Sequence, residues 1–301
     1  MKQRSFLSPG PGSFHRLAYT DWGAPGSPRV AVCAHGLTRN GRDFDALARA
    51  LEDDYRVICP DMPGRGRSDW LDDPERYGYP LYVADAAALL RRITHAGAAS
   101  FWRRLGRWLA GRPRIAQVDW VGTSMGGIIG MMLAAQKHSP IRRLVLNDVG
   151  PVVPARALNR LGDYVGRDPH FASLDALEAY VREVYRTFGP LTDNQWRHLA
   201  AHSYRRTADG RYAPNYDPAI GRAFAKPFER DLELWPVWDA IRCPVLVLRG
   251  ADSDLLTRDT VRRMQERGPG ARLVEFAGIG HAPALMAADQ VRPVREFLLA
   301  G

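Results

Sequence analysis

Six short apolar runs, separated by longer segments of helical periodicity, are the feature that most restricts the fold of this chain. Apolar residues fill most positions of each run, which is typical of strands buried on both faces of a parallel sheet. The segments between them have the periodicity of helices that connect parallel strands. The pattern therefore predicts an α/β fold with a mostly parallel central sheet flanked by helices. The expected strands are 29–34, 55–59, 117–121, 144–146 with its neighbours, 244–248 and 272–276, with antiparallel additions near 15–22, and the expected helices are 41–52, 81–93, 125–138, 259–267 and 289–299.

One interval interrupts this alternation. Between Pro151 and about Pro236 there is no convincing strand, and aromatic and polar residues mix at helical spacing. The interval is far too long for an ordinary connection between two strands. A chain of 301 residues lies at the upper end of what one α/β domain holds. We therefore expect a single core formed by residues 1–150 and 237–301, with residues 151–236 as a helical insertion over the end of the sheet.

The composition excludes several classes of protein. Hydrophobic residues make up 46% of the chain and charged residues 25%, as in ordinary globular proteins. No stretch approaches the roughly 18 apolar residues of a membrane span, and the N-terminal residues lack the apolar core of a secretory signal. The three cysteines, Cys33, Cys59 and Cys243, are an odd number, and two of them lie in apolar runs. This favours reduced thiols and a cytoplasmic location over a disulfide framework.

The formal net charge of +9 is a local feature. Residues 91–117 contain seven arginines and no acidic residue, which leaves +2 for the rest of the chain. Because no nucleic-acid-binding motif accompanies this charge, we expect no nucleic-acid partner. Within this stretch, residues 101–109 place apolar side chains on one helical face and arginines on the other. We expect the apolar face to pack on the domain or on a second subunit of a homo-oligomer. The alternative is that the segment adsorbs to an anionic lipid surface or a hydrophobic granule.

The strongest chemical signal is the sequence VGTSMGG, which contains Gly122, Ser124 and Gly126 between a predicted strand and a predicted helix. This strand–turn–helix context is typical of a nucleophile elbow, in which the turn holds the serine in a strained backbone conformation. Glycines two residues before and after the serine remove side chains that would collide in the turn. The pattern presents the Ser124 hydroxyl above a helix N-terminus, whose free amides favour developing negative charge.

A serine nucleophile needs a base, and the base needs an acid that orients it. His281 lies in the small loop GIGHAP after a late strand and before the C-terminal helix, so we interpret it as the base. The acid should follow a strand and lie between the serine and the histidine in chain order. We favour Asp254, which two leucines follow and can anchor, with Asp252 as the first alternative. Asp148, which also ends a strand, is the second alternative.

The anionic oxygen of a tetrahedral intermediate needs fixed hydrogen-bond donors. The sequence AHGLTRN follows the first central strand, and Gly36 lets the chain turn back toward the serine. We assign the backbone amides of Leu37 and Met125 as these donors. His35 is expected to brace the loop by hydrogen bonds.

Residues that bind the substrate are less sharply indicated. Arg39 and Asn40, next to the predicted oxyanion loop, are placed to meet a polar group of the substrate. The insertion also contains a group of aromatic and imidazole side chains that can line an acyl or alcohol pocket. From this group we select Trp196, His202 and Tyr216.

Taken together, these motifs resemble the α/β-hydrolase superfamily. The resemblance implies an α/β-hydrolase fold with Ser124 as nucleophile, an aspartate after the penultimate strand, His281 as base, and a cap domain at the helical insertion. Two features depart from the family pattern: Ser253 stands where the family has its aspartate, and the connection before the serine strand is longer than usual. The matching segments are AHGLTRN, CPDMPGRGRSDW, VGTSMGG, LVLNDVGP, CPVLVLRGADSDLL and GIGHAP, in the family's order.

A serine at the elbow implies an acyl-serine intermediate and excludes relatives that use an aspartate there, such as haloalkane dehalogenases and epoxide hydrolases. We expect a carboxylic-ester hydrolase that acts on small or medium acyl substrates without a cofactor or metal. The alternatives are cleavage of a C–C bond in ring-cleavage diketones and hydrolysis of hydroxyalkanoate oligomers or lactones. A ligand-binding receptor on a hydrolase fold is the non-enzymatic alternative.

Overall fold

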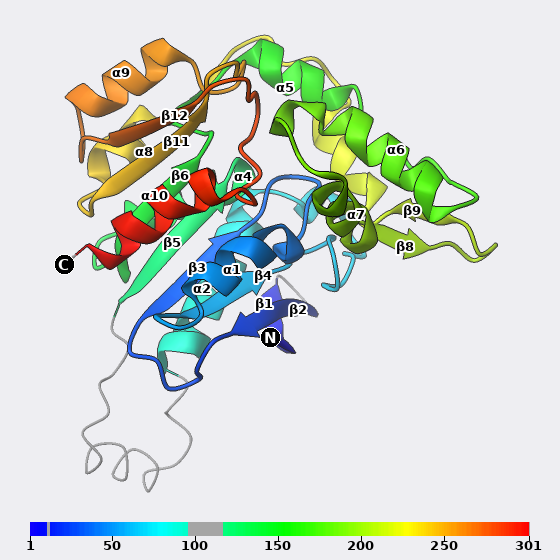
Figure 1. Ribbon diagram of the computed structural model, residues 1–301, viewed down its shortest axis with the longest axis horizontal. Coiled ribbons are helices and arrows are strands. Elements are labelled where there is room, and N and C mark those ends of the chain that lie inside the picture. Colours follow the sequence, from blue (N-terminus) through cyan, green and yellow to red (C-terminus); the bar gives the residue numbers. More distant parts are fainter. Residues whose placement is uncertain (11–12, 96–116, 301) are drawn as a thin grey trace, which may run out of the picture.

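The computed structural model describes residues 1–10, 13–95 and 117–300, and its centre is an eight-stranded sheet (Figure 1). The strand order is β1-β2-β4-β3-β5-β6-β11-β12, and the last six of these strands run parallel. β1 and β2 pair antiparallel, and β2 adds antiparallel to β4. The predicted α/β fold with a mostly parallel sheet is therefore confirmed. The strands are β1 (Lys2–Gly10), β2 (Ser13–Trp22), β3 (Val30–Ala34), β4 (Arg56–Pro60), β5 (Val118–Thr123), β6 (Ile141–Asn147), β11 (Val245–Gly250) and β12 (Arg272–Phe276).

The order of the strands reverses at β3, since β4 lies on one side of it and β5 on the other. In open α/β sheets, ligands bind in the crevice outside the carboxyl ends of the strands at such a point. The loop that starts at His35 leaves the carboxyl end of β3, and Ser124 follows the carboxyl end of β5. The topology therefore brings two of the predicted functional segments to one place.

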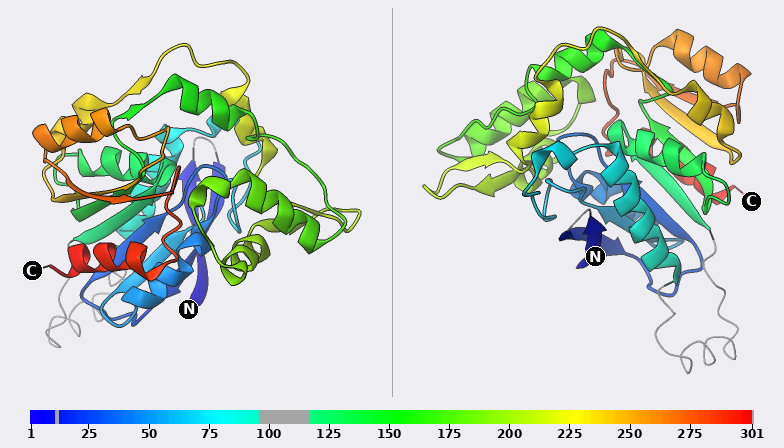
Figure 2. Two further views of the ribbon diagram at one scale, coloured as in Figure 1. Left: turned by 45° about the horizontal axis from the view of Figure 1, so that its top comes forward. Right: turned by 180° about the vertical axis from the view of Figure 1, so that it is seen from behind.

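Helices cover both faces of the sheet (Figure 2). On one face, α1 and α10 contact each other and bury Leu47 and Phe297 against the strands. On the other face, α2, α4 and α8 bury Leu89, Ile129 and Trp238. The helices of the core are η1 (Gly41–Phe44), α1 (Asp45–Leu51), η2 (Pro74–Arg76), α2 (Tyr79–His95), α4 (Met125–Ala134), α8 (Trp235–Ala240), α9 (Arg258–Glu266) and α10 (Ala288–Leu299).

Residues 151–236, here called the inserted segment, leave the sheet after β6 and contribute no strand to it within the described chain. Their helices lie beyond the carboxyl ends of the parallel strands (Figure 1). Leu177, Val181, Trp196 and Leu199 join α6 and α7 in a hydrophobic cluster of their own. The segment contains β7 (Val152–Val153), α5 (Ala155–Gly162), α6 (Leu174–Val184), η3 (Arg186–Phe188), α7 (Asp193–His202), β8 (Tyr204–Arg206), β9 (Tyr212–Pro214), η4 (Pro218–Phe224) and β10 (Leu232–Glu233), and α8 begins at its end.

The expectation that this segment lacks strands is wrong in detail. β7 pairs with β10, and β8 pairs with β9, both antiparallel. These strands have only two or three residues, too few to show the alternation over four to eight residues by which a strand is read from sequence. The division into residues 1–150 and 237–301 as core and 151–236 as cap domain stays a prediction.

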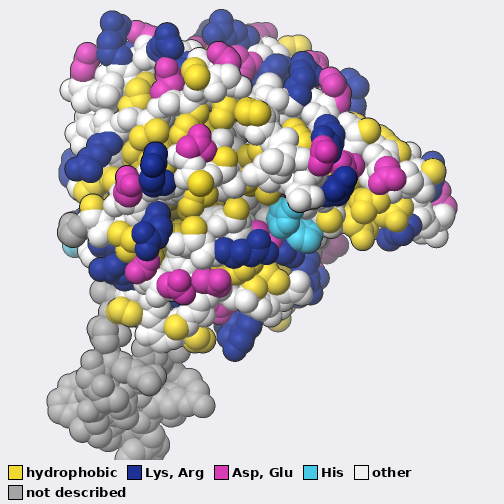
Figure 3. All heavy atoms as spheres, viewed as in Figure 1, with side chains coloured by type: hydrophobic (Ala, Val, Ile, Leu, Met, Phe, Trp, Pro, Cys, Tyr) yellow, Lys and Arg dark blue, Asp and Glu magenta, His cyan; other side chains and the backbone are white. Residues whose placement is uncertain are grey.

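Residues 101–109 lie outside the described residues, so the interpretation of their amphipathic pattern stays a prediction. In the described chain no helix is both long and apolar enough to cross a membrane. On the face drawn in Figure 3, basic and acidic side chains are interspersed over the described surface.

Candidate active site

Ser124 lies in the sharp turn between β5 and α4. Its backbone has φ 52° and ψ −117°, a region that non-glycine residues rarely adopt. A Cβ at Gly122 would lie 2.3 Å from the carbonyl oxygen of Gly126, and a Cβ at Gly126 would lie 2.1 Å from that of Ala34. Only glycine therefore fits at these two positions. The turn has the strained geometry of a nucleophile elbow and packs directly against the end of β3.

His281 faces the serine from the loop after β12. Its Nε2 lies 3.0 Å from Ser124 Oγ, and its side chain is 10% exposed. The inserted segment fixes this loop, because Thr187 Oγ1 donates to the carbonyl oxygen of His281 at 2.5 Å and Gly280 N donates to that of Thr187 at 2.8 Å. The sequence-predicted pair of Ser124 and His281 is thus brought within hydrogen-bonding distance.

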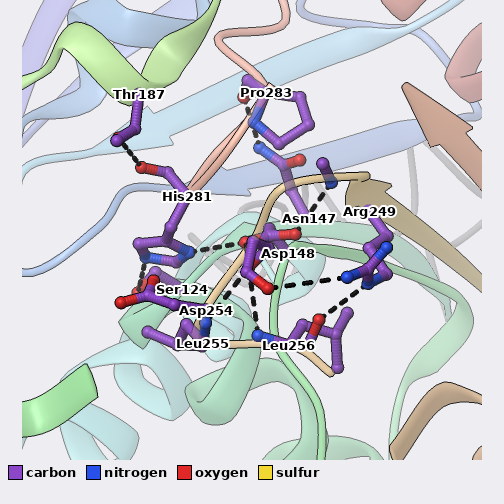
Figure 4. A network of polar contacts seen from close by, with 12 residues as sticks. Ser124, Asn147, Asp148, Thr187, Arg249, Asp254, Leu255, Leu256, His281 and Pro283 are labelled. Atoms are coloured by element: carbon purple, nitrogen blue, oxygen red, sulfur yellow. Dashed lines mark hydrogen bonds and ion pairs between the residues drawn. The ribbon is translucent and has the colours of Figure 1, made fainter. Parts of the chain in front are cut away.

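Asp148, and not Asp254, is the acid that contacts the histidine. Asp148 Oδ2 lies 2.8 Å from His281 Nδ1, so His281 lies between Ser124 and Asp148 (Figure 4). The carboxylate is completely buried, and it also accepts hydrogen bonds from Ser253 Oγ at 2.5 Å and from Gly250 N at 2.9 Å. Three donors therefore satisfy a charge that burial would otherwise make costly.

The preference for Asp254, with Asp252 as first alternative, is therefore corrected. Asp254 pairs instead with Arg160 of α5, through contacts of 2.6 and 2.9 Å, and its side chain is 39% exposed. Burial raises the pKa of Asp254, but the Arg160 guanidinium outweighs this and lowers it. Asp252 is exposed, and its backbone amide donates to Ile279 O at 2.9 Å.

Two sequence signals favour Asp148. It follows the last residue of β6, a strand hydrogen-bonded to β11, so the two strand ends are neighbours. Ser253 occupies the place of the family's aspartate and is a donor to a carboxylate rather than a carboxylate itself. A serine at position 253 therefore indicates that the acid is supplied by another strand end, here that of β6.

The predicted oxyanion loop borders the serine. A Cβ at Gly36 would lie 3.7 Å from Ser124 Cβ, in ordinary contact. Arg65, which is completely buried, donates from Nε to the carbonyl oxygen of Leu37 at 2.8 Å, and its Nη2 lies 3.8 Å from Met125 Sδ. Its Nη1 donates to the carbonyl oxygen of Pro63 at 2.7 Å and to the Tyr82 hydroxyl at 2.8 Å. Arg65 thus contacts the carbonyl oxygen of Leu37 and the sulfur of Met125, the two residues whose amides we predict as oxyanion donors.

His35 braces this loop as predicted. Its Nδ1 lies 2.7 Å from the carbonyl oxygen of Gly36, and its Nε2 accepts from Met62 N at 2.9 Å. Burial lowers the pKa of His35 to about 4, so the ring is neutral near pH 7. Nearby, burial raises the pKa of Asp61 to about 6, against the backbone amides of Gly41 and Arg67 that favour its charged form.

Arg39 and Asn40, predicted to meet a polar group of the substrate, are occupied with other protein groups. Arg39 forms a bidentate pair with Asp43 at 2.6 and 2.8 Å and stacks on Tyr185, and only 5% of its side chain is exposed. Burial opposes the charge of Arg39, but the Asp43 carboxylate raises its pKa overall. Asn40 donates from Nδ2 to the carbonyl oxygen of His202 at 2.8 Å and caps η1.

The three predicted pocket residues of the inserted segment do not form one group. Trp196 packs inside the α6–α7 cluster, and His202 contacts His198 edge-to-face, with the ring centroids 4.5 Å apart. Tyr216 is 3% exposed and donates to the carbonyl oxygen of Arg167 at 3.0 Å. Tyr216 and Arg39 do line a small cavity beside Thr38, whereas Trp196 and His202 do not.

The row from Asp148 through His281 to Ser124 can carry out nucleophilic acyl chemistry. The imidazole Nε2 can accept the serine proton while the Nδ1–H stays on Asp148. A carboxylate in this position fixes the tautomer and stabilises the imidazolium that forms.

Comparison with known proteins identifies the family of this chain. The model of the alpha/beta hydrolase family matches residues 31–294. The chain belongs to the alpha/beta hydrolase family. It is 42% identical to a 3-hydroxybutyrate-oligomer hydrolase of Cupriavidus necator, over 95% of this chain and 94% of that protein.

Solved structures of alpha/beta hydrolases show the same fold. A putative hydrolase from Rickettsia typhi has a TM-score of 0.86 and 32% identity, with 99% of each chain covered. An alpha/beta hydrolase from Novosphingobium aromaticivorans has a TM-score of 0.80 and 34% identity, with 99% of this chain and 97% of that chain covered. The predicted superfamily and its fold are confirmed, and the protein is a hydrolase of this family.

Proposed function

We propose that this hydrolase cleaves carboxylic esters through an acyl intermediate on Ser124, and that its natural substrates are short oligomers of hydroxyalkanoic acids. The observation that carries the proposal is the hydrogen-bonded row in which His281 lies 3.0 Å from Ser124 Oγ and 2.8 Å from Asp148 Oδ2. The substrate class rests on the similarity to the 3-hydroxybutyrate-oligomer hydrolase.

In the first half of the reaction, Ser124 Oγ attacks the ester carbonyl carbon and gives its proton to His281 Nε2. The carbonyl oxygen becomes negative, and the Leu37 and Met125 amides hold it. The ester C–O bond then breaks, and His281 returns the proton to the departing alkoxide. The products of this half are an acyl-serine and an alcohol, which for an oligomer is the shortened hydroxy acid.

In the second half, water attacks the acyl-serine and gives its proton to His281 Nε2. The second tetrahedral intermediate collapses, and His281 protonates the Ser124 oxygen. Asp148 keeps the Nδ1–H oriented throughout both halves, and its charge stabilises each imidazolium.

The cavity beside Thr38, one residue after Leu37, has a volume of about 10 Å³, which is room for one water molecule, so the proposed substrate class rests on the similarity to the relative and not on this cavity. Thr38 Oγ1 lies 2.9 Å from the Tyr185 hydroxyl. The cavity is lined mainly by tyrosines and other polar side chains: Thr38, Arg39, Tyr164, Tyr180, Tyr185, Ser203 and Tyr216, with Leu177, Val181 and Pro214.

The nucleophile is tested by Ser124→Ala. We expect kcat for p-nitrophenyl butyrate to fall on the order of 10⁶-fold, as in serine hydrolases that lose their nucleophile. Ser27→Ala is the matched control, because the Ser27 hydroxyl bonds backbone groups of Arg29 and Asp54 in a loop before β3. Near-normal turnover by the Ser124 variant contradicts the acyl-serine mechanism.

The substrate class is tested with a panel on the wild-type protein. It contains the dimer and trimer of 3-hydroxybutyrate, alkyl butyrates of matched length, a lactone and a vinylogous diketone. We expect kcat/KM to be highest for the hydroxybutyrate oligomers. A higher value for the diketone or for the plain alkyl esters refutes the substrate class but leaves the serine mechanism intact.

A further inference from the structure

Two histidines and an aspartate meet where the inserted segment touches the core, away from the Ser124 row. His198 and His202 lie one turn apart on α7, and Asp45 is the first residue of α1. The Nε2 atoms of the two histidines lie 3.5 and 4.0 Å from Asp45 Oδ2. One donor atom of each residue lies within 4.8 Å of the other two. Histidine side chains reach the surface over this region in Figure 3.

These donors match the chemistry of a transition-metal site. Zinc takes imidazole nitrogen and carboxylate oxygen at about 2.0–2.2 Å, which puts two tetrahedral ligands roughly 3.4 Å apart. The separations of 3.5 and 4.0 Å are close to that value, so small side-chain rotations close the site. Two histidines at positions i and i+4 of a helix face the same side and present two ligands together.

Asp45 already pairs with an internal cation, the Arg42 guanidinium, which a metal ion has to displace. Asp45 is 1% exposed and accepts three hydrogen bonds from the Arg42 guanidinium, at 2.5 to 3.0 Å. The Arg42 side chain is 23% exposed, so it can turn toward solvent when another cation replaces it. His198 Nε2 lies 3.1 Å from the carbonyl oxygen of Arg42, a contact that a metal also replaces.

We propose that His198, His202 and Asp45 bind a divalent transition-metal ion such as Zn²⁺, with Arg42 as the competing internal cation. Three protein ligands leave a fourth position for water. Because α7 belongs to the inserted segment and α1 to the core, the bound ion links the two. Asn40 Nδ2 already donates to the carbonyl oxygen of His202 at 2.8 Å beside this site. The ion therefore reinforces a contact that is built into the fold.

The test uses the full chain without a histidine tag, stripped with chelator and titrated with ZnCl₂ by calorimetry. We expect one ion per chain, and a rise in the melting temperature as Zn²⁺ is added, because the ion binds the folded state. His198→Gln and His202→Gln should each raise Kd at least about tenfold. Arg42→Ala should lower Kd, because it removes the competing cation while Asp45 stays in place.

Two control variants exclude other donors. His170→Ala removes a histidine of the inserted segment that pairs with Asp168, and Cys243→Ser removes a partly exposed thiol. Both should bind Zn²⁺ as the wild type does. The proposal is overturned if Zn²⁺ does not bind, if either control abolishes binding, or if the His198 and His202 variants bind unchanged. It is also overturned if Arg42→Ala weakens binding, since Arg42 would then support the site rather than compete for it.

Discussion

Replacing Asp148 by asparagine tests the assignment of the acid most directly. The Oδ1 atom of Asp148 accepts from Gly250 N at 2.9 Å, and Oδ2 accepts from His281 Nδ1 at 2.8 Å. Oδ2 also contacts the Ser253 hydroxyl at 2.5 Å, which can rotate and accept a hydrogen bond instead, whereas the Gly250 amide can only donate. In Asp148→Asn, the new amide oxygen therefore faces Gly250. The new NH₂ group then faces His281 and forces Nδ1 to accept a hydrogen bond.

The magnitude follows from the tautomer. With Nδ1 as acceptor, the imidazole proton sits on Nε2 and points to Ser124 Oγ, 3.0 Å away, so the ring cannot accept the serine proton. In a serine protease the same substitution lowers kcat by about 10⁴-fold, or about 5 kcal/mol of transition-state stabilisation. We expect a loss of this order, with a smaller change in KM.

The assay is kcat for p-nitrophenyl butyrate, with Asp254→Asn as the matched control. Asp148 has φ 56°, which asparagine tolerates, so a native melting temperature is expected and confirms the fold. Asp254→Asn removes only the ion pair with Arg160 and should keep kcat within about tenfold of wild type. The assignment is refuted if Asp148→Asn keeps more than a tenth of wild-type kcat, or if Asp254→Asn shows the large loss instead.

Three further outcomes follow from the packing around the row. Because the folded-state pKa of His35 is about 4, below its ordinary 6.5, the unfolded chain binds the extra proton first as pH falls, and stability is lost between pH 6.5 and 4. This loss is about 3 kcal/mol of the free energy of unfolding. In His35→Asn, urea unfolding between pH 6.5 and 4 should no longer show it, whereas the opposite pH dependence that comes from Asp61 should remain. In Gly126→Ala the new Cβ would lie 2.1 Å from a backbone oxygen of β3. We therefore expect urea unfolding to show at least about 2 kcal/mol of destabilisation, together with a large loss of activity. An unchanged melting temperature contradicts this packing. Arg65→Met should lower kcat about tenfold or more with little change in KM in steady-state assays, because Arg65 contacts both predicted oxyanion residues, and an unchanged kcat shows that the charge has no such effect.

The sequence predicts the sheet well because most residues of the central strands are apolar. It also predicts Ser124 and His281, since an elbow and a glycine-bounded loop are local patterns. The acid is harder, because several strands end in carboxylates and only the packing of neighbouring strand ends decides which one reaches the imidazole. Ser253, which donates to Asp148, is the local clue that a carboxylate is not needed at its own position.

The predicted substrate residues show a second limit of sequence reasoning. A side chain next to a functional loop is available to a ligand only if the protein does not already bond it. Arg39 has its acidic partner Asp43 four residues later, a spacing that is visible in the sequence. The partner of Asn40 is the carbonyl oxygen of His202, 162 residues away, which no local pattern indicates.

Moving the acid from the β11 loop to the end of β6 has a structural consequence for the inserted segment. The strands are adjacent, about 4.8 Å apart, so a carboxylate at either end can reach the Nδ1 side of an imidazole whose Nε2 is fixed by the serine. With Asp148 in that role, the loop after β11 needs only Ser253 at the site. Asp254 is then free to pair with Arg160 of α5, which joins the inserted segment to the core beside His281. The same loop thus supports the acid through one residue and holds the segment over the site through the next.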